Sequence, residues 1–141
     1  MTTQNRYELV EHTADIGVTV RAESIARLFE DAGYAMCDLI TDAGAIRPEA
    51  KKKIEVEAQD YEELLVNWLG ELLYIFDTRQ LLLPHFEIHE IDEKHLKAAA
   101  RGERLNRDRH ELRYDIKAVT YFGLKVLQQD DQWTASVVFD I

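Results

Sequence analysis

Cysteine is almost absent from this sequence, which contains Cys37 as its single thiol. An intramolecular disulfide is therefore excluded, and so is a zinc site that requires several thiolates. The six glycines follow none of the spacings that cradle a nucleotide phosphate, and no nucleophile-elbow motif occurs. Because Cys37 stands beside the apolar face of a predicted helix, we expect it to be a packed residue and not a nucleophile.

Long apolar runs are also missing. Those that occur, such as 81–83 and 137–139, are far too short to span a membrane. The polar segment 1–6 contains no apolar core of the kind found in signal sequences. We therefore expect a cytoplasmic protein without a membrane partner.

The charge is one-sided, with 27 acidic and 17 basic residues and a formal net charge of −10. This balance argues against a protein that encloses a phosphate backbone, because such binding depends on neutralisation by basic side chains. It permits a cation or a basic protein as partner, while solubility is the simplest interpretation of most of these acids. The length and the hydrophobic fraction of 46% fit one folded domain over residues 1–141.

Two segments have apolar residues at helical spacing. The first begins after the N-cap Ser24 and ends at Ile40. The second begins after the N-cap Asp60, with Glu63 in the position of a capping box. Gly70 inside this second helix costs about 1 kcal/mol relative to alanine, and we expect it to allow close packing against a sheet.

Alternating or short apolar segments predict the strands. They cover residues 7–11, 16–21, 54–58, 81–91, 95–104, 116–127 and 132–141, of which the last four form two hairpins. The order of elements predicts an α+β fold, with two helices packed on a largely antiparallel β-sheet in a single-domain two-layer sandwich.

The histidines do not point to a shared metal. His85 and His89 are four residues apart, which suits metal binding on a helix, but this spacing in a strand separates them by about 13 Å. We therefore expect no metal between them.

Carboxylates near both ends of the chain are better candidates for a cation site. Asp15 precedes a strand and points away from the apolar face that begins at Ile16; a turn residue is the simplest interpretation of Asp15 alone. The chain ends at Asp140-Ile141, so a side-chain carboxylate and the terminal carboxylate lie one residue apart. Carboxylates this close repel each other unless a cation lies between them, and oxygen ligands favour calcium or magnesium. The residues alone leave open whether these groups bind a metal or are solvated.

Several segments, in order along nearly the whole chain, resemble the archease family. They are Glu11-His12-Thr13-Ala14-Asp15-Ile16-Gly17, Leu28-Phe29-Glu30, the acidic helix 60–77 with Leu64-Leu65-Val66-Asn67-Trp68-Leu69, Lys117-Ala118-Val119-Thr120-Tyr121, and the terminal Phe139-Asp140-Ile141. One departure is Phe122, where family members often have histidine.

This resemblance implies an accessory protein that is not itself an enzyme. Archeases assist the GTP-dependent RNA-splicing ligase of tRNA splicing and RNA repair, promoting its guanylylation and repeated turnover, and they contact RNA only indirectly. The family's calcium site, transferred by position, falls on Asp15, Asp140 and the main-chain carboxylate of Ile141. Lys117 is a further candidate for assisting activation, with a solvated strand lysine as the alternative.

Two other functions remain open from the residues. One is a metal-dependent phosphoester hydrolase, for which His12 is the only evident base. The other is a metal-independent protein-binding chaperone module. The segment 101–113 contains five arginines and could contact acidic protein or RNA, although a solvated loop is the simpler interpretation.

Overall fold

The computed structural model describes residues 6–141. Its elements are β1 (Glu8–Glu11), β2 (Asp15–Ala22), α1 (Ile25–Ile40), a 3-10 turn (Ala43–Ala45), β3 (Ala50–Glu57), α2 (Tyr61–Arg79), β4 (Leu81–Ile91), β5 (His95–Arg104), β6 (Ala118–Gln129) and β7 (Gln132–Asp140). Every predicted helix and strand is present, and β4 and β5 have the predicted bounds. The polar segment 1–5, where we expect no signal core, lies outside the described residues.

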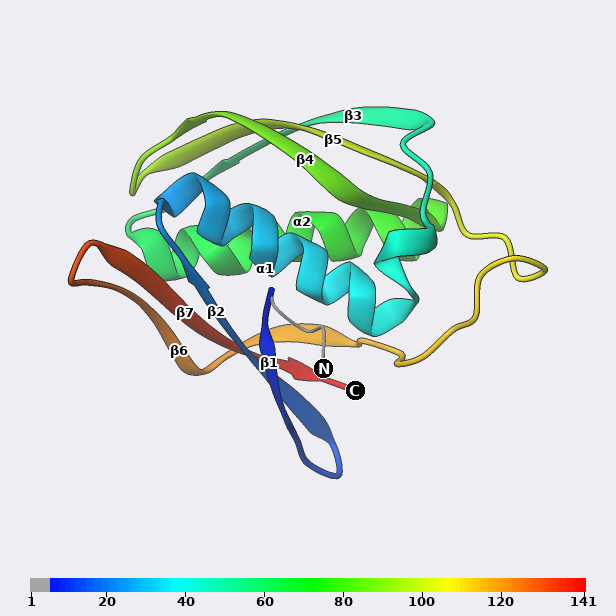
Figure 1. Ribbon diagram of the computed structural model, residues 1–141, viewed down its shortest axis with the longest axis horizontal. Coiled ribbons are helices and arrows are strands. Elements are labelled where there is room, and N and C mark those ends of the chain that lie inside the picture. Colours follow the sequence, from blue (N-terminus) through cyan, green and yellow to red (C-terminus); the bar gives the residue numbers. More distant parts are fainter. Residues whose placement is uncertain (1–5) are drawn as a thin grey trace.

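The strands form two antiparallel sheets, in the orders β1-β2-β7-β6 and β3-β5-β4. The two helices lie between these sheets and contact both of them (Figure 1). The α+β class and the antiparallel pairing are therefore confirmed, but the strands are divided into two sheets with the helices as a middle layer, where we expected one sheet. The reason is that buried residues of α2 cover more than one face of the helix, so both sides need an apolar partner.

Both helices begin at the predicted caps. The Ser24 hydroxyl accepts a hydrogen bond from the Arg27 amide at 3.1 Å, and the Asp60 carboxylate accepts one from the Glu63 amide at 2.8 Å. The Glu63 carboxylate in turn accepts the Gln59 amide at 2.8 Å. These bonds satisfy amides that a helix start leaves without an intrahelical partner.

The expected role of Gly70 is wrong. A Cβ atom at Gly70 would meet nothing within 4 Å, so this glycine allows no close contact. The close approach occurs at Gly102 in β5, where a Cβ atom would lie 1.6 Å from the carbonyl oxygen of Leu82 in β4. The β4–β5 register shifts between Leu82 and His85, which brings the two backbones together at this point.

One hydrophobic core joins the helices to both sheets. Trp68 is fully buried, and its indole N–H donates to the Phe29 carbonyl at 2.9 Å. Cys37 is also buried, and burial raises the pKa of its thiol to about 12. This confirms that Cys37 is a packed residue. Within residues 6–141, no helix is both long and apolar enough to cross a membrane.

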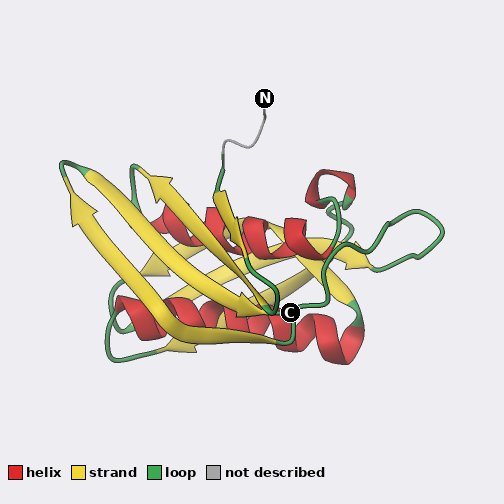
Figure 2. Ribbon diagram, turned by 90° about the horizontal axis from the view of Figure 1, so that it is seen from below, coloured by secondary structure: helices red, strands yellow, loops and turns green. Residues whose placement is uncertain are grey.

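The C-terminal strand β7 occupies an interior position of its sheet, between β2 and β6. Figure 2 shows the C-terminus at the end of this sheet, close to the segment that leads into β6. A final strand that pairs on both sides holds its last residues in place, whereas chain ends usually fray. The fold therefore holds the backbone of β7 in place as far as Asp140.

Candidate functional site at one end of the four-stranded sheet

The fold places Asp15 and Asp140 directly opposite each other. They are partners in the antiparallel pairing of β2 with β7, next to the partners Ile16 and Phe139. Ile16 and Phe139 are fully buried on the inner face of the sheet. Because side chains alternate along strands and opposed residues share a face, the two aspartates project from the outer face. This confirms the predicted orientation of Asp15.

The terminal residue is tied to the same place. The Ile141 amide donates to the Ala14 carbonyl at 3.1 Å, so the last peptide unit lies beside the segment that contains Asp15. The Ile141 side chain is half-buried and packs against the core. The last peptide unit is therefore held beside the strand pair that contains the two aspartates. The last strand ends at Asp140, one residue before the predicted end at 141.

Lys117 approaches from the other side of Asp140. Its amide donates to the Asp140 carbonyl at 2.8 Å, and the next residue, Ala118, is the register partner of Asp140 in β6. The Lys117 side chain is exposed. The structure thus brings together all four site residues singled out from the sequence: Asp15, Lys117, Asp140 and Ile141.

The two aspartates at this end of the sheet form no ion pair with another described residue. Within residues 6–141, no lysine, arginine or histidine nitrogen lies within 4.0 Å of the Asp15 or Asp140 carboxylates. Two like charges directly opposed across antiparallel strands destabilise the pair. A cation from solvent or from another molecule would relieve this repulsion.

The donor chemistry fits a hard cation but does not form a complete cage. No three His, Cys, Asp or Glu side chains converge to hold a metal in the described part of the chain. Two side-chain carboxylates are available, so the main-chain carboxylate of Ile141 would have to be the third ligand. Calcium takes six to eight oxygen ligands, and water or a partner would have to supply the remainder.

An apolar hollow of about 430 Å³ lies next to the carboxylates on the outer face of the sheet. Its wall includes Asp15, His12 and Val10 from the first hairpin and Phe122 from β6. The Phe122 side chain is 79% exposed, which is unusual for a phenylalanine. The hollow therefore combines apolar surface with the acidic end of the sheet.

A bulge in β6 produces this aromatic rim. The pairing with β7 shifts register between Thr120 and Lys125, and Gly123 within the bulge has a φ of +64°. Tyr121 is 62% exposed beside Phe122. Bulges often re-aim side chains next to functional sites. Sequence reasoning missed this feature, although a glycine inside a predicted strand is a signal for a bulge.

His12 shares the hollow with Asp15, and its amide donates to the Asp15 carbonyl at 2.9 Å. The neighbouring Glu11 accepts a hydrogen bond from the Tyr114 hydroxyl at 2.6 Å. This bond raises the pKa of Tyr114, and it links the segment before β6 to the N-terminal motif. The motif 11–17 is therefore fixed by contacts on both of its sides.

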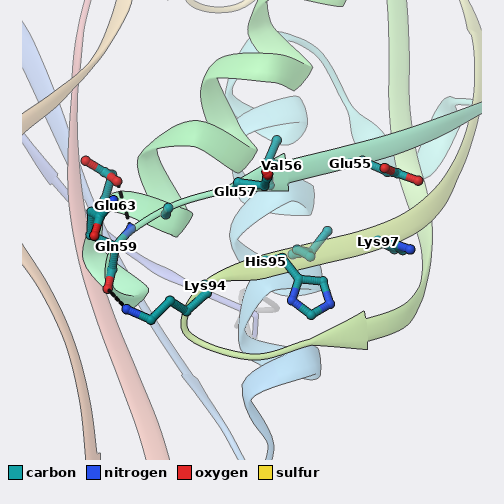
Figure 3. Close-up of a pocket in the computed structure, with 10 residues that line it drawn as sticks. Glu55, Val56, Glu57, Gln59, Glu63, Lys94, His95 and Lys97 are labelled. Atoms are coloured by element: carbon teal, nitrogen blue, oxygen red, sulfur yellow. Dashed lines mark hydrogen bonds between the residues drawn. The ribbon is translucent and has the colours of Figure 1, made fainter.

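A larger hollow of about 700 Å³ lies at the end of β3 and β5 (Figure 3). Several of its polar groups form hydrogen bonds at the start of α2. The Gln59 amide donates to the Glu63 carboxylate, and the Gln59 carbonyl accepts a hydrogen bond from the Lys94 ammonium at 3.4 Å. His95 in the same hollow lies 3.2 Å from the Asp92 carboxylate. These groups already have partners, so the smaller hollow beside Asp15 is the better candidate. His85 and His89 lie in β4 as expected, and His85 hydrogen-bonds the Ile46 carbonyl at 2.7 Å.

Comparison with known proteins shows close similarity over nearly the whole chain. A family model described as the archease protein family matches residues 7–141. Protein archease of Methanosarcina acetivorans is 38% identical over 140 residues, covering 96% of each chain. Protein archease of Pyrococcus abyssi is 39% identical over 140 residues, covering 96% of this chain and 99% of the relative.

Solved structures agree with these matches. The solution structure of Methanobacterium thermoautotrophicum protein 1598 superposes with a TM-score of 0.80 at 32% identity, covering 96% of this chain and 98% of that one. A crystal structure of an archease from Thermotoga maritima, described as a possible chaperone, superposes with a TM-score of 0.67 at 22% identity. It covers 99% of this chain and 100% of that chain, and it supports the fold alone.

Proposed function

Since this chain belongs to the archease family, we propose that it is an accessory protein of the GTP-dependent RNA-splicing ligase and promotes ligase guanylylation and multiple turnover. The observation that carries the proposal is the meeting of Asp15, Asp140 and Ile141 at one end of the four-stranded sheet. These are the positions onto which the family resemblance transfers a calcium site.

The carboxylates are suited to act on a partner. Asp140 is exposed at the end of its strand, so it can approach a cleft in another protein. Pairing of β7 on both sides holds its backbone in place, and a rigid backbone keeps charged groups in a defined arrangement. Calcium would be held by Asp15, Asp140 and the Ile141 carboxylate, and when bound it would supply positive charge for phosphate oxygens of the nucleotide.

Lys117 provides a cationic group at the same end of the sheet. Its exposed ammonium can donate to a phosphate oxygen or a carboxylate of the partner. We assign it an activating role in the proposed complex. A Lys117→Gln variant that stimulates the ligase as well as the wild type would show that Lys117 is a solvated strand lysine.

The aromatic bulge provides contact area for the partner protein. Tyr121 and Phe122 are exposed in this bulge, and Phe122 lines the same hollow as Asp15. Aromatic residues are enriched in protein–protein interfaces. The same observation supports a second candidate function, a chaperone module that binds apolar segments without a metal. A hydrolase is supported only by the position of His12 beside Asp15.

The test measures guanylylation of the ligase and multiple-turnover RNA joining, with and without this protein. Asp140→Asn is compared with Asp131→Asn, which removes the same charge at the other end of β7, about 30 Å away. Asp131 has a φ of +64°, a conformation that asparagine also tolerates. We expect the wild type and Asp131→Asn to stimulate both reactions and Asp140→Asn to lose stimulation.

Added residues after Ile141 should have the same effect as Asp140→Asn, because they remove the terminal carboxylate from its place. Equal stimulation by all variants would rule out the carboxylate mechanism. It would still support the ligase as the partner of this protein. No stimulation by the wild type would contradict the accessory role. In that case, suppression of aggregation that is insensitive to chelators would favour the chaperone, and turnover of phosphate esters by the protein alone would favour the hydrolase.

A further inference from the structure

Six of the 17 basic residues of this acidic protein lie on one surface. We define the basic surface by six exposed residues at one end of the three-stranded sheet and in the loops beside it: Arg47, Lys51, Lys53, Arg101, Arg104 and Arg107. We propose that this basic surface binds the phosphate backbone of single-stranded RNA directly. The proposal goes beyond the accessory role and does not depend on it.

A row of basic residues that includes the cations of Lys51 and Arg101 crosses the three strands of this sheet. Lys51 in β3 is the register partner of Arg101 in β5, and Arg101 is the register partner of His85 in β4. Directly opposed like charges destabilise a sheet. Within residues 6–141, no carboxylate lies within 4.0 Å of the Lys51 or Arg101 cations, although the chain has 27 acidic residues. An anion bound from outside would relieve this repulsion.

A buried carboxylate orders the loop that continues the basic surface. Glu103 is 6% exposed, accepts the Arg47 amide at 2.7 Å and pairs with the Arg109 guanidinium. Buried His110 lies 3.3 Å from the same carboxylate. Glu103 therefore neutralises Arg109 and fixes the loop against the sheet.

Three of the six cations line a hollow of about 650 Å³. Its wall contains these three arginines, Arg47, Arg104 and Arg107, together with Glu49, Glu103 and Arg109. Within the described residues, the only ion pair of these three arginines joins Arg47 to Glu49 at 4.0 Å, between two exposed side chains. Such a pair is weak in water, so its arginine remains available to an external anion.

A second, smaller hollow lies on the other side of the charged row. It has a volume of about 240 Å³ and is lined by Lys51, Lys53 and Lys97, and also by Glu55 and Glu90. The Glu90 carboxylate lies 3.8 Å from the Lys97 ammonium, so Lys51 and Lys53 are the cations of this hollow that remain without an ion-pair partner among the described residues. The two hollows lie on either side of the row that contains Arg101, because Ala99 lines the smaller hollow and Glu103 lines the larger one along the same strand β5. A flexible chain of phosphates can therefore contact cations at several successive points.

The chemistry of the basic surface favours phosphate over an acidic protein. The exposed large hydrophobic residues of the described chain are Leu9, Val10, Tyr74, Leu112, Tyr121, Phe122 and Leu127, and none belongs to the basic surface. Protein interfaces need a desolvated apolar core, whereas phosphate contacts need only cations and N–H donors. The planar guanidinium groups of arginine also match phosphate oxygens in bidentate hydrogen bonds.

The basic surface lies away from the end of the four-stranded sheet that contains Asp15 and Asp140. The three-stranded sheet and the four-stranded sheet lie on opposite sides of the helix layer (Figure 1). Binding of RNA by the basic surface therefore does not cover Asp15 or Asp140. The net charge of −10 argues against a protein that encloses RNA, but a local surface of this kind is compatible with it.

The test uses the full chain alone, with a fluorescently labelled single-stranded RNA and anisotropy measured over a range of salt concentrations. The double variant Lys51→Gln/Arg101→Gln is compared with Arg79→Gln/Lys125→Gln, which removes one lysine and one arginine from other exposed positions. Unchanged circular dichroism and melting temperature verify that both variants are folded. We expect wild-type binding that weakens with salt.

For the surface variant, we expect binding roughly tenfold weaker or worse, and a salt slope smaller by about 1.4, from two lost phosphate contacts. The control variant should bind like the wild type. Three results would overturn the proposal: no wild-type binding at about 100 µM protein and low salt, equal losses in both double variants, or tighter binding of polyglutamate than of RNA. The last result would assign the surface to an acidic protein.

Discussion

Replacing Asp140 with asparagine removes one of two carboxylates that face each other across β2 and β7. The substitution keeps the size of the side chain and its place at the end of the strand. Without calcium the variant should be more stable than the wild type, because the two carboxylates of the wild type repel each other. With calcium the variant should be less stable than the wild type, because both carboxylates then bind the cation.

The magnitude without calcium follows from the strand register. Side chains directly opposed in an antiparallel pair have Cβ atoms about 5 Å apart. Two unit charges at about 5 Å in water repel by about 0.8 kcal/mol. In the presence of a chelator, Asp140→Asn should therefore be more stable than the wild type by at most this amount, which raises the melting temperature by roughly 2–4 °C.

Calcium should reverse this order. A ligand that binds only the folded state stabilises it by about 2.7 kcal/mol at roughly 100 times its Kd. The wild type should gain this stability, whereas Asp140→Asn loses a ligand and should gain much less. The assay is thermal unfolding of both proteins and of Asp131→Asn, with a chelator and with increasing calcium.

Two outcomes would refute the reasoning. An equal rise in melting temperature for Asp140→Asn and the wild type would show that Asp140 is not a calcium ligand. No rise for the wild type would show that the carboxylates at this end of the sheet do not bind calcium. If Asp131→Asn also loses the response, the effect comes from net charge and not from a site.

The structure also makes three predictions about stability and reactivity. Gly102→Ala should destabilise the protein by several kcal/mol, because its Cβ atom would collide with the backbone of the adjacent strand, whereas Gly70→Ala meets no atom and should raise stability by about 0.5–1 kcal/mol; denaturant unfolding of both variants is the measurement. Burial alone would raise the pKa of Glu103, but hydrogen bonds from the Arg47 amide and the Arg109 guanidinium lower it below its usual value. The stabilisation by ionised Glu103 is therefore complete above the unfolded-state pKa and is lost as the pH falls through the folded-state pKa. Glu103→Gln should lower the free energy of unfolding by roughly 3 kcal/mol at neutral pH and by less in acid. A difference between variant and wild type that stays constant over a pH series of unfolding curves would contradict this. Cys37 should resist a thiol reagent in the folded protein and react only on unfolding, because burial raises its pKa to about 12; rapid labelling of the native protein would show that the helix opens locally.

Local patterns predicted the elements well because each depends on neighbours in the sequence. Ser24 and Asp60 cap their helices as expected, since capping bonds span only three residues. The hairpin of β4 and β5 has the predicted bounds, because alternation and a turn at Asp92 define it locally. The position of Asp15 on the outer face also followed from the alternation of its strand.

Other features depended on which strands pair, and no local pattern encodes that choice. The expected contact at Gly70 was wrong and the contact at Gly102 was missed, because both depend on the distance to another element. The bulge that exposes Phe122 arises from a register shift against β7, which the sequence of β6 marks only by a glycine. The burial of Glu103 likewise depends on a loop that folds back on it.

By itself, the sequence determined the order of helices and strands, their apolar faces, and the family to which the chain belongs. Those properties come from short-range periodicity and from motifs read along the chain. Only the tertiary structure decided that the strands form two sheets around the helices, and that Asp15 faces Asp140 while the Ile141 amide binds the Ala14 carbonyl. These contacts join opposite ends of the chain, and their partners are fixed by burial of a shared core, which no single segment can determine.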